Sequence, residues 1–350
     1  MLKPLLGVDV LGGFAVVLIM DSKPLCDLHI HLGSSVAPHV LWSIAHQQGF
    51  KLPVRNYWEF VDLVTADPNK VRSLQDYLAI LHNWTEKIQS SPSAVEQSVY
   101  EVIGKEFRSS HVARIELRFN PMKRNLEGER DLDHIIHAAV RGMDRACLEY
   151  GVEAGLIFCL AREFPPDQNE KILAKALKYR NRGVVGIDLA GTETETVELS
   201  DAVGQYAELF ARARDGGLGT TVHTGETRAT CGEGVIAVVK HLKPDRIGHG
   251  IRAAYSDEAL DLLAERGTVL EVCPTSNIHT RAVESLEEFR TVLQTFRERG
   301  VRHTVNTDGT YLCRTNLRRE FDILLEIGAI SPEQAEHARK LAFEASFIQA

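Results

Sequence analysis

Two histidines separated by a single residue, His29 and His31, are the first side chains whose spacing points to chemistry. Successive residues of a β-strand point to opposite faces, so these two imidazoles would share one face of a strand. Their neighbours Leu28, Ile30 and Leu32 are apolar, which favours a strand in the protein interior. Neutral imidazoles directed together into an interior suit a metal ion. Because the chain contains 14 histidines, this pair needs further ligands from other segments before it defines a site.

The elements that would position such ligands follow an alternating pattern. Apolar runs of strand length recur along the chain, and segments with helical spacing of apolar residues separate them. This alternation favours an α/β fold with a parallel sheet covered by helices, and eight units favour a (β/α)8 TIM-type barrel. The expected strands are the segment around His29, Val112–Phe119, Gly155–Leu160, Gly183–Leu189, Leu218–Thr224, Arg246–Gly248, Thr268–Cys273 and Val301–Asn306. The later expected helices are Leu132–Tyr150, Glu170–Arg180, Asp201–Arg214, Gly234–His241, Asp257–Glu265 and Leu286–Arg299.

The region between the first two strands is longer than one helix requires. It contains four amphipathic segments, which we interpret as a helical insertion over the mouth of the barrel. These segments are Pro38–Gln48, Tyr57–Val64, Leu74–Ile88 and Ala94–Arg108.

Further metal-ligand types occur where later strands end. His223 ends the fifth expected strand, His249 the sixth and Asp308 the eighth. Active sites of (β/α)8 barrels are built at the C-terminal ends of the strands, so these side chains should meet the HxH pair. Three imidazoles and one carboxylate fit zinc with one position left for water. Histidines on helices and loops, including His82, are expected to be solvated.

Composition limits the other function classes. A formal charge of −8 and a pI near 6.0 argue against a nucleic-acid or anionic-membrane surface. Six scattered cysteines without a CxxC pair predict reduced thiols and a cytoplasmic protein. Residues 1–19 lack the features of a secretory signal, and we expect either a short strand packed onto the fold or an extension upstream of the true start. Residues 20–350 are expected to form one domain, and the sequence leaves the oligomeric state open.

Seven short motifs, taken in order, resemble the adenosine deaminase family of the amidohydrolase superfamily. The resemblance extends from about Lys23 to near the end of the chain, and it is specific as a set although each motif alone is weak. The motifs are DLHIHL (27–32), ELRFNP (116–121), GIDLAGTE (186–193), HTGE (223–226), RIGHG (246–250), EVCPTSN (271–277) and NTD (306–308).

The resemblance implies roles for particular residues. Glu226 would protonate a ring nitrogen of the substrate, which makes the adjacent amino-bearing carbon electrophilic. His249 would orient or deprotonate a zinc-bound water whose pKa the metal lowers to roughly 7, and Asp308 would accept a hydrogen bond from that water. The implied ligands of one zinc ion are His29, His31, His223 and Asp308. Binuclear relatives carry a lysine at the end of the fourth strand, and this chain has none there. The PCxxC signature of cytidine-type deaminases is also absent.

Substrate contacts are expected to differ from those of the family. Relatives usually carry acids where this chain has Gly33 and Gly309, so the two glycines mark altered substrate recognition. Gly191 would allow the backbone to approach the substrate ring, and His31 would also border the substrate. The loss of two acids makes an anionic substrate easier to admit. A further hypothesis is that loop arginines meet a phosphate or carboxylate, the candidates being Arg162, Arg228 and Arg314.

We therefore expect a zinc-dependent hydrolytic deaminase that acts on an aminopurine nucleoside, nucleotide or related amino-heterocycle and releases ammonia. Two alternatives remain open from sequence. One is another mononuclear hydrolase of the superfamily, and the other is a catalytically silent binding protein with the same fold.

Overall fold

The structure, a computed structural model, describes residues 23–67, 71, 73–125, 131–193 and 203–349. The expected extension at residues 1–19 and the start of the helix expected from Asp201 lie outside these ranges. Among the described helices, none is long and apolar enough to cross a membrane.

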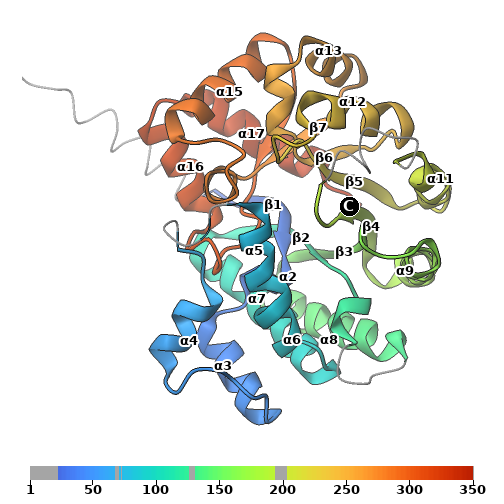
Figure 1. Ribbon diagram of the computed structural model, residues 1–350, viewed down its shortest axis with the longest axis vertical. Helices are drawn as coiled ribbons and strands as arrows, with labels where there is room; N and C mark the ends of the chain where they lie inside the picture. Colours follow the sequence, from blue (N-terminus) through green and yellow to red (C-terminus); the bar gives the residue numbers. More distant parts are fainter. Residues whose placement is uncertain (1–22, 68–70, 72, 126–130, 194–202, 350) are drawn as a thin grey trace, which may run out of the picture.

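Eight parallel strands form one sheet in sequential order, with the helices arranged around it (Figure 1). The barrel closes where the segment after β8 forms a bridge with β1. There, the His31 amide donates to the Asp308 carbonyl and the Asp308 amide donates to the His29 carbonyl, each at 2.7 Å. The expected (β/α)8 barrel is therefore confirmed. The strands are β1 (Leu25–His31), β2 (Val112–Phe119), β3 (Glu153–Ala161), β4 (Val184–Ala190), β5 (Gly219–Thr224), β6 (Arg246–His249), β7 (Val269–Val272) and β8 (His303–Val305).

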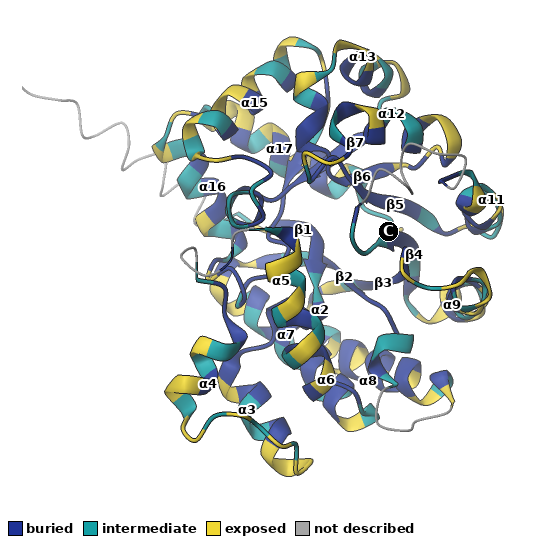
Figure 2. Ribbon diagram, in the orientation of Figure 1, coloured by how far each residue is buried: buried dark blue, intermediate teal, exposed yellow. Residues whose placement is uncertain are grey.

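Hydrophobic burial holds the helices against the strands, as the dark inner surfaces in Figure 2 show. Helix α8 (Leu132–Tyr150) illustrates the local rules. The Asp131 side chain accepts a hydrogen bond from the Asp133 amide at its start, and Gly151 ends it at a φ of 68°. Ile135, Ile136 and seven other residues of this helix are buried. Burying apolar area at about 25 cal/mol per Å² is the main stabilising term for such a helix.

The remaining long helices follow the barrel pattern. They are α9 (Pro166–Tyr179), α11 (Ala207–Asp215), α12 (Cys231–His241), α13 (Asp257–Arg266), α15 (Leu286–Glu298), α16 (Leu317–Glu326) and α17 (Pro332–Ala345), with the short α14 (Pro274–His279) after β7.

The insertion between β1 and β2 is helical, as expected, and part of it lines the pocket at the barrel mouth. Its expected third helix, Leu74–Ile88, is not continuous. A π-helical turn, Leu81–Thr85, separates α5 (Leu74–Ile80) from α6 (Glu86–Ile88). Single π turns inside helices are common at functional sites. The other helices of the insertion are α2 (Leu32–Ser35), α3 (Pro38–Gln47), α4 (Tyr57–Val64) and α7 (Pro92–Ser110).

Candidate active site

The strand ends bring the expected ligand side chains together. The Nε2 atoms of His31 and His223 lie 3.0 Å apart. Asp308 Oδ1 lies 3.5 Å from His31 Nε2 and 3.8 Å from His29 Nε2. The side chains come from β1, β5 and the turn after β8, so the barrel closure itself assembles the cluster.

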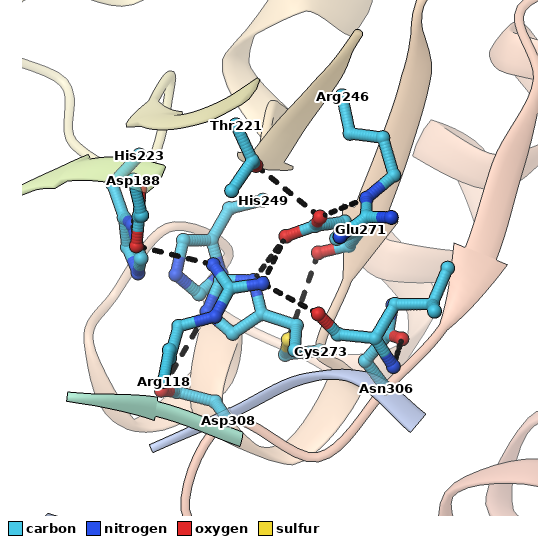
Figure 3. Close-up of polar contacts among 12 residues, drawn as sticks. Arg118, Asp188, Thr221, His223, Arg246, His249, Glu271, Cys273, Asn306 and Asp308 are labelled. Atoms are coloured by element: carbon cyan, nitrogen blue, oxygen red, sulfur yellow. Dashed lines mark hydrogen bonds and ion pairs between the residues drawn. The ribbon is translucent and has the colours of Figure 1, made fainter. Parts of the chain in front are cut away.

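Buried carboxylates orient two of these imidazoles, and Figure 3 shows one of them, His223, beside Asp188. His29 Nδ1 lies 2.8 Å from Glu271 Oε2, and His223 Nδ1 lies 2.9 Å from Asp188 Oδ2. A carboxylate accepts the Nδ1–H, so the Nε2 lone pair of each ring faces the cluster. Glu271 and Asp188 were not singled out from the sequence, although both lie within motifs that carry the family resemblance.

An ion network inside the barrel fixes these carboxylates. Arg118 pairs with Asp188 at 3.2 Å and with Glu271 at 2.8 Å. Arg246 pairs with Glu271 at 2.6 Å and also contacts Glu116. All five side chains are almost fully buried, and buried charges require such pairing.

The cluster fits a metal ion. Burial first, then nearby positive charge, lowers the pKa of His29 and His31 well below the usual value, so both rings are neutral. His29 Nε2 is buried and has no hydrogen-bond partner within the described residues. Lone pairs of neutral imidazoles beside a carboxylate form the donor set that zinc prefers. The lone pairs and the carboxylate of this cluster can all coordinate one cation, whereas they cannot all form hydrogen bonds with one another.

His249 and Asp308 share an unusual backbone conformation. Their φ angles are 64° and 63°, in the left-handed region that non-glycine residues seldom occupy. Such strain, of order 1–3 kcal/mol per residue, clusters at functional sites. The spacing of the motifs does not predict this backbone conformation.

The Asn277 side chain sets the hydrogen-bonding state of His249. Asn277 Oδ1 accepts the Cys273 amide at 3.1 Å, so its Nδ2 faces His249 Nδ1 at 3.0 Å. Nδ1 is thus the acceptor, and burial lowers the pKa of His249, so the neutral ring carries its proton on Nε2. That Nε2 lies 3.5 Å from Glu226 Oε2.

Glu226 is a buried carboxyl with a raised pKa. Burial first, then the charges of Asp308 and Glu193, raises the pKa of Glu226 well above the usual value. The chain around Glu226 is held by Glu193, whose carboxylate accepts the amides of Gly225 (2.8 Å), Glu226 (3.1 Å) and Thr227 (3.3 Å). Sequence reasoning gave Glu193 no role, because nothing in a single motif predicts contact with residues 32 to 34 positions later.

Of the three glycines named from the sequence, Gly33 and Gly191 line the pocket, and Gly309 follows the lining residue Asp308. Gly191 has a φ of 99°, where a side chain would be strained. A Cβ on Gly309 would lie 2.5 Å from Ser34 Oγ and 2.7 Å from Tyr77 Oη. A Cβ on Gly33 would lie 3.1 Å from Nη2 of the nearest arginine, Arg124. Other side chains therefore stand beside the positions where relatives carry acids.

The loop arginines named from the sequence do not line the pocket. Arg162 is buried, and its guanidinium donates to backbone carbonyls, including that of Leu189 at 3.1 Å. The guanidinium of Arg228 contacts Glu284, and that of Arg314 contacts Thr65. Sequence reasoning missed three cations that do line the pocket, Arg118, Lys123 and Arg124.

The expectation that His82 is simply solvated was wrong. His82 lines the pocket from the π turn, and its Nδ1 lies 2.6 Å from Glu86 Oε2. The helical spacing of residues 74–88 gives no indication that this face overlies the barrel mouth.

Fold and site together define a (β/α)8 barrel with a metal-type donor cluster and a buried acid at its mouth. The family model described as adenosine deaminase matches residues 24–350. An adenosine deaminase from Enterococcus faecalis is 33% identical over 325 residues, covering 93% of this chain and 92% of the relative. The chain belongs to the adenosine deaminase family.

Two solved structures share the fold. An amidohydrolase from Burkholderia ambifaria with bound zinc superposes with a TM-score of 0.84 at 20% identity, covering 98% of this chain and 90% of the neighbour. The N6-mAMP deaminase of Arabidopsis superposes with a TM-score of 0.79 at 24% identity, covering 95% and 96%.

Proposed function

We propose that this protein is a hydrolytic deaminase. Water would replace the exocyclic amino group of an aminopurine nucleoside, nucleotide or related amino-heterocycle, and ammonia would leave. Family membership supports the reaction class. The observation that carries the proposal is the buried Glu226 carboxyl, whose pKa is raised, in one pocket with the histidine cluster.

One zinc ion is the proposed cofactor. Bound zinc lowers the pKa of a water ligand to about 7 and so supplies a nucleophile at neutral pH. The donor types, the buried His29 Nε2 and the zinc of the Burkholderia neighbour support this choice. The proposed ligands are His29, His31, His223 and Asp308, and the possible ligand atoms of His29, His31 and Asp308 form one compact group.

The side chains around the cluster have distinct proposed roles. Glu226, whose pKa is raised by burial, would donate a proton to the ring nitrogen next to the amino-bearing carbon. His249 would act as a hydrogen-bond donor through Nε2–H and thus orient the attacking water, because Asn277 occupies Nδ1. This favours the orienting role over deprotonation. Asp308 would accept a hydrogen bond from the same water through its carboxylate.

The proposed substrate contacts are His31, Gly33, Gly191 and Gly309, all of which border the pocket or adjoin a residue that does. Gly191 would present its backbone to the ring. The Tyr77 hydroxyl stands beside Gly309 and hydrogen-bonds Asp308 Oδ2 at 3.4 Å, so a phenol replaces the acid that relatives carry near this point.

The free thiols, four of the six buried, support a cytoplasmic location.

Ammonia release tests the proposal. Zinc-loaded protein would be incubated with adenine, adenosine, adenosine 5′-monophosphate, their N6-methyl derivatives and an aminopteridine. The release of ammonia or methylamine would be measured. We expect release from at least one compound. Cleavage of an amide panel without ammonia release would favour another hydrolase of the superfamily, and binding without turnover would favour a silent binding protein.

A further inference from the structure

An arginine that the proposed reaction does not use lines the active-site pocket. Arg124 lies in a single 3-10 turn, Met122–Arg124, directly after β2. Its side chain is 1% exposed, and it is among the largest fully buried side chains of the described protein. A charged group of this size is seldom placed beside a pocket without a partner.

Within the described residues, Arg124 is under-paired. Its Nη2 lies 3.3 Å from Glu86 Oε1, while its Nε and Nη1 have no hydrogen-bond partner. The buried arginines of the barrel interior differ, since Arg118 and Arg246 each pair with two carboxylates. The pKa values show the same contrast. Burial lowers the pKa of Arg124, whereas carboxylate partners raise those of Arg118 and Arg246 despite burial. Arg124 therefore retains two buried N–H donors, on Nε and Nη1, without an acceptor among the described residues.

Glycine at position 33 places no side chain against the guanidinium of Arg124. A Cβ built on Gly33 would lie 3.1 Å from Arg124 Nη2 and 3.3 Å from Glu86 Cγ. An acid there would lie against the guanidinium and compete with any anion from solution. With glycine at position 33, no second carboxylate is added next to Glu86 beside Nη2.

The charges bordering this end of the pocket favour an anion. Lys123 and Arg124 contribute two positive charges, and Glu86 contributes one negative charge. Although burial opposes it, the Arg124 charge and the His82 hydrogen bond lower the pKa of Glu86 to about 2, so Glu86 is ionised at neutral pH. The Lys123 ammonium contacts Glu163 at 2.5 Å, but that carboxylate is 45% exposed and outside the pocket lining. Exposed pairs of this kind contribute little and exchange partners readily.

We propose that Arg124, assisted by Lys123, forms an anion subsite that holds a phosphate or carboxylate carried by the substrate. A guanidinium has paired N–H donors that match both groups in bidentate fashion. The inference rests on the proposed deaminase function and narrows its substrate to an amino-heterocycle with a negatively charged substituent. The arginine that serves this purpose is thus not one of the loop arginines named from the sequence.

Matched substrates test the subsite. Ammonia release is measured for adenosine, adenosine 5′-monophosphate and adenosine 5′-carboxylate with wild-type protein, R124Q, R124K and R228Q. For the wild type, we expect kcat/KM for one anionic compound to exceed that for adenosine at least tenfold. R124Q should lower this anionic-to-neutral ratio by about 30-fold or more, and R124K should give an intermediate ratio. R228Q is the control, since Arg228 is an exposed arginine outside the pocket lining, and its ratio should match that of the wild type. The anionic substrate with the higher kcat/KM shows whether the subsite binds a phosphate or a carboxylate.

A second measurement uses only the wild-type protein and so does not depend on whether the variants fold. Inorganic phosphate and acetate should inhibit wild-type turnover of the neutral nucleoside competitively. The subsite is refuted if R124Q lowers kcat/KM for all three substrates by the same factor. It is also refuted if the wild type has its highest kcat/KM with adenosine and neither phosphate nor acetate inhibits competitively. Those results leave deamination itself intact. An absence of ammonia from every compound tested, neutral and anionic, overturns the proposed function and the subsite with it.

Discussion

Glu271→Gln tests how the barrel interior prepares the metal site. Glu271 Oε2 accepts hydrogen bonds from His29 Nδ1 and from Arg118, both at 2.8 Å. Its Oε1 accepts from Arg246 Nε at 2.6 Å and from Thr221 at 3.2 Å. A glutamine has one acceptor oxygen, so its amide nitrogen must face donors on one of these two sides.

The expected loss follows from those contacts. Removing one partner of a buried ion pair costs about 3–5 kcal/mol, and here two buried arginines lose a shared carboxylate. His29 also loses the acceptor that fixes its Nδ1–H. Loss of such an orienting partner lowers metal affinity by about 10- to 100-fold. Glu271→Gln should therefore reduce both the free energy of unfolding and zinc affinity.

Glu116→Gln is the matched control. Glu116 pairs with the same Arg246 and is equally buried, and its other hydrogen bonds go to Ser346 and Phe347 rather than to His29. Denaturant unfolding of both variants should show comparable destabilisation. Zinc titration against a chromophoric chelator, carried out on the folded proteins, should show a loss of affinity for Glu271→Gln alone. Equal zinc affinity in the two variants would refute the role of Glu271 in orienting His29.

The two remaining predictions concern the proposed acid. Glu226→Gln should retain zinc and lose at least ~10²-fold in kcat, because an amide cannot deliver the proton; near-normal ammonia release would show that another group is the acid. Glu193→Gln should also retain zinc and lower kcat by about 10²-fold, since the Gly225–Thr227 amides that position Glu226 lose a carboxylate acceptor. An unchanged kcat in that variant would mean that the turn holds its shape without Glu193.

The barrel could be predicted because its signals are local. Apolar strand runs alternate with amphipathic helices, and the polar ligand types sit where strands end. Strand bounds were less accurate: β8 was expected over Val301–Asn306 and spans His303–Val305. The π turn at Leu81–Thr85 could not be predicted, because it extends a helix by a local hydrogen-bond shift that leaves the apolar pattern intact.

The residues missed from sequence act across long separations in the chain. Arg124 meets Gly33 and Glu86 only after β1, β2 and the insertion have packed. Glu193 reaches its turn through the register of β4 against β5. The loop arginines were predicted to bind an anion because they follow strands. Arg228, however, contacts Glu284 and does not line the pocket. The direction of a loop side chain is fixed by tertiary contacts that no spacing rule contains.

The most direct test is the metal dependence of ammonia release. The protein would be stripped with a chelator, checked for residual metal, and assayed on the best compound of the panel while zinc is added back. Our account predicts no release from the stripped protein and full recovery at one equivalent of zinc per chain. Undiminished release after complete metal removal, or recovery only at two equivalents, would contradict a single-metal hydrolytic site.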